Sequence, residues 1–115
     1  MKDLRALPDR VRSTAIVLDN GEVMWPFDAA VEAITSVAAA GGLVLGLDLR
    51  SDGPQVERQG LATEVPVAEF TPSGNGADRI DAMNEALTAL RSPMVIDLVA
   101  DGYAWVLITW TSDLR

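Results

Sequence analysis

The sequence predicts an α+β fold with two layers, in which two main helices pack on one face of a mostly antiparallel sheet of four to five strands. Two segments with apolar residues at helical spacing and several segments with alternating apolar residues lead to this expectation. A length of 115 residues fits one domain, which we expect to span residues 1–115.

The first twenty residues predict a short helix or an irregular lead-in, followed by a strand. Leu4, Leu7 and Val11 have helical spacing, but Pro8 interrupts it because proline breaks helix hydrogen bonding. Residues 15–18 are consecutively apolar and indicate a strand, and residues 22–24 indicate a short extended piece.

The segment 26–40 is predicted to form the first main helix. Pro26 suits the first helical position, where its missing N–H has no intrahelical partner to lose. The pair Gly41-Gly42 is expected to end the helix. The residues expected to face the core are Phe27, Ala30, Val31, Ile34, Val37 and Ala38.

Residues 43–50 are predicted to form a strand with one buried and one partly wet face. Four leucines alternate along it and are expected to face the core: Leu43, Leu45, Leu47 and Leu49. The other face would carry Val44, Gly46, Asp48 and Arg50. Residues 61–67 are predicted to form a further strand, confined by Pro66 to a sheet edge or to a strand end.

A second helix is predicted from residue 76 to 91, capped by Asn75 and ended by Ser92-Pro93. Its expected core stripe is Ile80, Met83, Ala86, Leu87 and Leu90. Residues 94–99 and 103–111 are then predicted to form two strands of a hairpin, because Asp101-Gly102 is a strong turn signal. Trp105 and Trp110 would lie on opposite faces of the last strand.

The composition excludes several classes of chemistry. The chain has no cysteine and no histidine, which excludes disulfides, thiolate nucleophiles, cysteine-ligated metals and the Ser-His-Asp triad. Nine Lys and Arg residues against 17 Asp and Glu residues give a net charge of −8, which disfavours nucleic acid and anionic membranes as main partners. The sequence also shows no apolar stretch typical of a targeting signal or membrane span, so we expect a cytoplasmic protein.

Two loops resemble ligand-binding motifs and fail on particular residues. Residues 48–53 are spaced like part of a calcium loop, but Arg50 holds a ligand position and Gln59 stands where a glutamate belongs. Residues 73–76 precede a helix as in a phosphate loop, but no Lys and Ser/Thr follow. We therefore expect no metal, no cofactor and no catalytic residue, and we interpret Asp97 as an outward-facing residue on a half-exposed strand.

In three segments, VMWPFDAAVEAI at 23–34, LVLGLD at 43–48 and YAWVLITWTS at 103–112, the sequence resembles a family of bacterial immunity proteins found beside polymorphic or contact-dependent toxins. Residues 23–34, with the sequence VMWPFDAAVEAI, resemble the opening helix of that family. The segment LVLGLD at 43–48 resembles its next strand, and residues 103–112 are similar to its closing strand with a Thr-Trp pair, although Ile108 precedes that pair here. The resemblance does not extend to residues 51–78.

This resemblance implies a protein that neutralises a cognate toxin domain by binding it. Complementary charge would speed association with a basic toxin. The candidate partner-binding residues are Asp48, Arg50, Asp52, Glu57 and Glu64. Two alternatives stay open: a small carboxylate-based enzyme, and a structural module that forms a homodimer. As an inhibitor, the protein could be a monomer or a homodimer.

Overall fold

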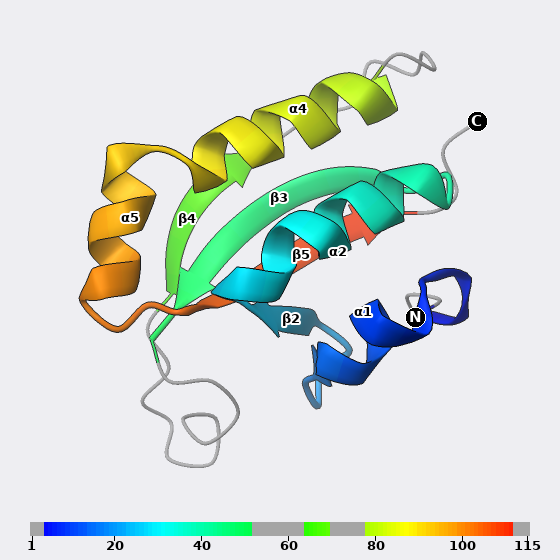
Figure 1. The fold of residues 1–115 in the computed structure, drawn as a ribbon, viewed down its shortest axis with the longest axis horizontal. Coiled ribbons are helices and arrows are strands. Elements are labelled where there is room, and N and C mark those ends of the chain that lie inside the picture. The colour runs from blue at the N-terminus through cyan, green and yellow to red at the C-terminus, as the bar shows by residue number, and fades with distance from the viewer. Residues whose placement is uncertain (1–3, 52–63, 70–77, 112–115) are drawn as a thin grey trace.

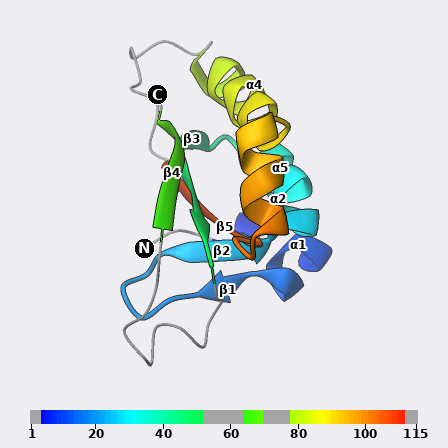
Figure 2. The same cartoon turned by 90° about the vertical axis from the view of Figure 1, so that its left-hand side faces the viewer.

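The predicted α+β class is confirmed by a computed structural model, which describes residues 4–51, 64–69 and 78–111. Five antiparallel strands form one sheet in the order β1-β2-β5-β3-β4. The helices of the described residues lie on one side of this sheet, as Figures 1 and 2 show from two directions. The fold therefore has one helix-covered sheet face and one face that no described helix covers.

The centre of the sheet is formed by the strand that comes last among the described residues. Strand β5 (Trp105–Thr111) pairs with β2 (Val23–Pro26) on one side and with β3 (Leu43–Arg50) on the other. The short strand β1 (Ile16–Val17) and strand β4 (Glu64–Glu69) form the two edges. The predicted edge position of the strand containing Pro66 is thus confirmed, while the predicted start at residue 61 lies outside the described residues.

The lead-in segment is helical on both sides of Pro8. A 3₁₀ turn, η1 (Leu4–Ala6), precedes Pro8, and α1 (Asp9–Thr14) follows it. Proline suits a position just before a helix, where its missing N–H removes no hydrogen bond. The strand predicted at 15–18 is limited to two residues because the chain turns back at Gly21, which has a φ of 87°.

Helix α2 (Phe27–Ala39) follows the prediction closely, with one error in its buried face. The helix begins one residue after Pro26, and Gly41, with a φ of 93°, lies just beyond its end. Val31 was predicted in the core but is 41% exposed, whereas Ala33 is fully buried. The helix therefore presents a slightly rotated face, on which a small alanine side chain permits close approach to the sheet.

Helix α4 (Asp78–Leu90) is also rotated relative to its predicted stripe. Ile80 is 45% exposed, while Ala82 is buried in its place. Its buried positions recur every four residues: Asp78, Ala82, Ala86 and Leu90. The predicted cap, Asn75, lies outside the described residues.

The strand predicted at 94–99, and with it the closing hairpin, is wrong. This segment forms helix α5 (Pro93–Ala100). The Ser92 hydroxyl accepts a hydrogen bond from the Val95 N–H at 3.3 Å, and Pro93 occupies the first helical position. Gly102, with a φ of 106°, follows the helix, so the Asp-Gly pair ends a helix instead of turning a hairpin.

The main core lies between the helices and the covered face of the sheet. Trp25 is fully buried and its ring centroid lies 5.8 Å from that of Trp110, with the planes tilted by 44°. The Trp25 indole N–H donates to the Val11 carbonyl at 2.9 Å, which ties β2 to α1. Trp110 belongs to this core and Trp105 to a smaller cluster on the other face, as predicted.

Within residues 4–51, 64–69 and 78–111, the longest apolar helices are too short to cross a membrane.

Candidate functional site

Two of the predicted partner-binding residues, Asp48 and Arg50, lie on the sheet face opposite the helices. They alternate on β3 with Leu47 and Leu49, which belong to the main core. Asp48 is partly buried, but Arg50 is only 3% exposed. Both residues already take part in interactions within the fold. Arg50 therefore offers little accessible surface, and Asp48 is the more exposed of the two.

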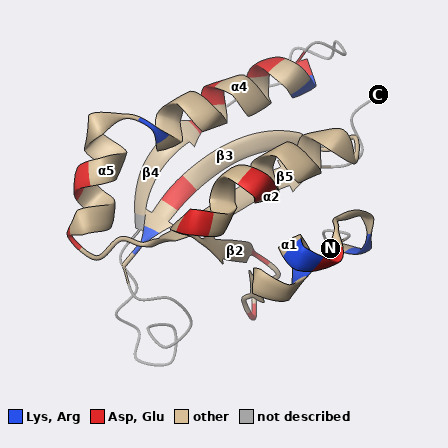
Figure 3. Cartoon of the chain, in the orientation of Figure 1, with Lys and Arg blue, Asp and Glu red and all other residues tan. Residues whose placement is uncertain are grey.

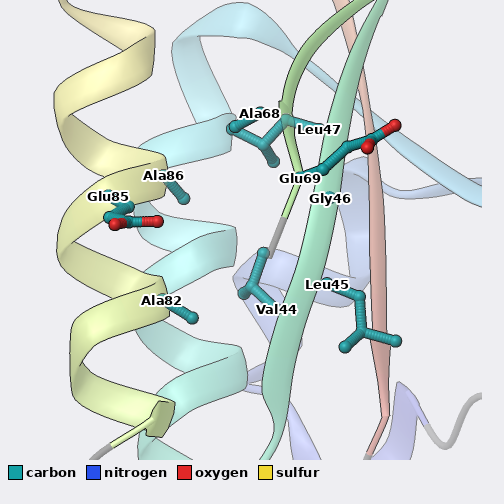
Figure 4. A pocket seen from close by; sticks show the side chains of 9 residues that line it. All are labelled: Val44, Leu45, Gly46, Leu47, Ala68, Glu69, Ala82, Glu85 and Ala86. Carbon is teal, nitrogen blue, oxygen red and sulfur yellow. The ribbon is translucent and has the colours of Figure 1, made fainter. Parts of the chain in front are cut away.

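The face of β3 differs from the simple alternation predicted for it. The pairing of β3 with β5 shifts register between Val44 and Gly46, which leaves Leu45 as the extra residue of a bulge. Val44 is consequently buried toward the helices, whereas Leu45 is half-buried and points away from α4 (Figure 4). The prediction that Leu45 lies on the core-facing side and Val44 on the wet side is thus wrong.

The third predicted contact, Glu64, begins β4 opposite Arg50 in the strand register. On the other side of Arg50, the register partner is Trp105 of β5. The backbone thus brings two of the five candidates onto neighbouring positions of adjacent strands. Asp52 and Glu57 lie outside the described residues.

A groove between β4 and α4 was not anticipated from the sequence. It is open to solvent and has a volume of about 490 Å³. Two acidic residues, Glu69 from β4 and Glu85 from α4, line it together with small or neutral polar side chains. The full lining consists of Ala68, Glu69, Asn84, Glu85, Thr88 and Ala89.

The sequence contains a signal for this groove. Pro66 marks the edge strand, and the helical spacing of Ala82, Ala86 and Ala89 gives α4 small side chains on the side near β3 and β4. Gly46 permits β3 and β4 to lie close together, since a Cβ atom at this position would lie 3.2 Å from the Ala68 carbonyl oxygen. Small residues on a helix next to an edge strand leave space that larger ones would fill.

The two groove carboxylates do not converge on one point. Figure 4 shows Glu85 on α4, beside Ala82 and Ala86, and Glu69 pointing away from α4. The space between α4 and β3 that these residues border is only about 10 Å³, close to the volume needed for a single water molecule. A pair of acids acting on one substrate would require both groups to face a common cavity.

The charges of the described residues are unevenly distributed over the fold. Figure 3 shows arginines gathered around α1, whereas α2 and α5 carry only acidic residues among their charged positions. Arg10 of α1 forms an ion pair with Glu32 of α2 at 2.6 Å, and Arg12 pairs with Asp9. Among the described residues, no group of three or more acidic side chains is placed to hold a metal ion.

Compared with models of protein families, with curated proteins and with solved structures, the chain finds no match in any of the three.

Proposed function

We propose that this chain is an immunity protein that binds and neutralises a cognate bacterial toxin domain in the cytoplasm. The observation that supports the proposal most is the position of the three segments that resemble such proteins. They contribute β2 with α2, β3, and β5, which are three adjacent central strands and the helix packed against all of them. Segments that are distant in the sequence thus form one packed unit.

The residues behind the resemblance act as scaffold. Trp25 and Trp110 are in ring contact in the core, and Gly46 permits β4 to approach β3. Such positions fix the sheet and the covering helix but present little surface to a partner. Recognition would then depend on the remaining surface, which includes the edge strand β4, helix α4 and the polar end of β3.

The charge of the chain fits a partner with a basic surface. A net charge of −8 attracts a basic toxin domain over a long range and raises the association rate. A few well-packed contacts would then set the dissociation rate. No step of this function requires the chain to transform a substrate.

A rescue experiment tests the proposal. The toxin domain encoded next to this chain's gene is expressed in bacterial cells with and without the chain, and growth is recorded. We expect growth only when the chain is present, together with tight binding of the two purified proteins. Unchanged toxicity in the presence of the folded chain would contradict the proposal.

A charge-reversal series tests the predicted contacts at the end of β3. The double variant Asp48→Lys, Asp52→Lys should associate about tenfold more slowly with the toxin and lose part of its salt dependence, because long-range attraction is reduced. The matched control is Asp97→Lys, Asp101→Lys, which changes two exposed acids at α5 by the same total charge. Since Asp48 interacts within the fold, Asp52→Lys alone is measured as well. Equal association rates in all three variants would show that Asp48 and Asp52 do not belong to the toxin-binding surface.

One alternative has an observation in its favour, namely a module that forms a homodimer. Met94 and Ile96 of α5 are 49% and 55% exposed, so this short helix presents two large apolar side chains to solvent. Sedimentation equilibrium of the purified chain, with Ile96→Lys as the comparison, measures whether this helix joins two copies. A monomer at all concentrations would exclude the alternative.

A further inference from the structure

The outer edge of β4 has no strand partner among the described residues. Strand β4 is the last strand in the sheet order and has six residues, whereas the opposite edge strand, β1, has only two. An edge strand exposes backbone N–H and C=O groups that can pair with another extended chain. Pro66 lacks an N–H, so the donors available at this edge come from the other residues of the strand.

Helix α4 runs beside this edge and leaves the groove described above. Ala68 and Glu69 contribute from the strand, and the exposed side chains of Asn84, Glu85 and Thr88 contribute from the helix. The groove is open to solvent, so a segment bound there would lie along the surface and not inside a cavity. An edge strand beside a helix is a geometry that suits addition of an extended segment, because the backbone pairs with the strand while side chains contact the helix.

The acidic charges at the groove favour a positively charged occupant. Glu69 and Glu85 line it, and none of its six lining residues is Lys or Arg. A second copy of this chain would bring the same acidic edge and a further net charge of −8, so like charges would oppose its pairing. A segment that carries Lys or Arg would instead meet complementary charges.

We propose that the β4–α4 groove binds an extended basic segment of a partner protein as an additional strand of the sheet. Side chains of a strand alternate between its two faces. Those on the helix side would meet Glu85, and those on the opposite side would meet Glu69, which points away from α4 (Figure 4). The inference deepens the proposed function and rests on it for the biological partner, a toxin domain that presents such a segment.

A peptide experiment tests the groove without the toxin. The probe is a fluorescein-labelled peptide of eight residues in which Lys-Lys and Val-Val pairs alternate, so that lysines lie on both faces of the added strand, and the readout is fluorescence anisotropy with the purified full chain. The wild-type chain should bind it more tightly than a peptide in which Glu replaces every Lys. The bound peptide should also shift the backbone amide NMR signals of Val67, Ala68 and Glu69.

Two groove variants and one matched control make the test specific. Glu85→Lys reverses one groove charge, and Thr88→Tyr fills the groove without changing the charge; each should weaken peptide binding at least tenfold. Asp97→Lys makes the same charge change as Glu85→Lys on α5 and should weaken binding less than twofold. All three substituted positions are exposed, so the fold should be retained, and circular dichroism checks this.

Each outcome decides a different point. Equal weakening by Glu85→Lys and Asp97→Lys would show only general attraction to an acidic protein and would overturn the groove proposal, as would the absence of any binding by the wild-type chain. Rescue from the toxin that is unaffected by Thr88→Tyr would also overturn it while leaving the inhibitor role intact. If the peptide binds at the groove but the chain does not rescue cells from the toxin, the proposed function is contradicted and the groove proposal stands.

Discussion

The two faces of the sheet are formed by the same strands but are stabilised in different ways. On the covered face, Trp25 and Trp110 pack with residues from the helices in one large core. On the opposite face, Leu18, Met24 and Leu107 form a small buried cluster next to the half-buried Trp105. The charged residues Asp48 and Arg50 also lie on that second face, because they alternate along β3 with leucines of the main core. The difference indicates that the covered face maintains the fold, whereas the opposite face combines limited packing with polar groups.

The largest expected effect is the loss of Trp25 from the covered face. Trp25→Ala should lower the free energy of unfolding by about 3–5 kcal/mol, because it leaves a cavity against Trp110 and removes the hydrogen bond to the Val11 carbonyl. Urea denaturation followed by circular dichroism measures the change. Trp25→Phe, which retains a ring but loses the N–H donor, should cost about 1–3 kcal/mol. Equal costs for the two variants would mean that packing contributes little at this position.

A smaller effect is expected on the opposite face. Leu107→Ala removes a side chain that is 1% exposed and contacts a cluster of only a few residues. We expect a loss toward the lower end of the range of about 2–5 kcal/mol seen for such substitutions, because a small cluster at a surface can relax around the cavity. The same denaturation experiment measures it. A cost larger than that of Trp25→Ala would reverse the comparison between the faces.

The smallest effect concerns α5, which covers one end of the core. The Ser92 hydroxyl caps this helix, and Val95 is its fully buried residue. Ser92→Ala should lower stability by about 1 kcal/mol, the usual contribution of a helix cap. Ser92→Thr retains the hydroxyl and should cost less. Identical stabilities of the alanine variant and the wild-type chain would show that the cap does not limit the stability of the covered face.

The sequence predicted the elements whose patterns are locally unambiguous. Proline before a helix and paired glycines after it defined α2, and the boundaries of β3 at residues 43 and 50 were predicted correctly. The bulge at Leu45 was missed because a shift in strand pairing depends on the neighbouring strand and not on the alternation within β3. The error in 94–99 has a local cause: Ser92-Pro93 was interpreted only as the end of one helix, although the same pair caps the next.

The candidate site was less accessible to sequence reasoning than the fold. Asp48 and Arg50 were correctly placed on the face opposite the core leucines, but the near-complete burial of Arg50 depends on packing from other segments. The β4–α4 groove joins Glu69 and Glu85, which are sixteen positions apart, and no motif connects them. Such a site arises from the relative position of a strand and a helix, which only the folded chain specifies.

The central position of β5 has a consequence for how the chain acquires its structure during synthesis. Before residues 105–111 have been made, β1 can pair only with β2, and β3 only with β4, so the native strand pairings available to the nascent chain form two halves of the sheet that share no strand pairing. Both inner edges then remain open, and the Trp25 ring lacks the indole of Trp110. Contacts between residues this distant in the sequence are also typically slow to form. Translation must therefore reach Thr111 before the two halves can be joined into one cooperative sheet.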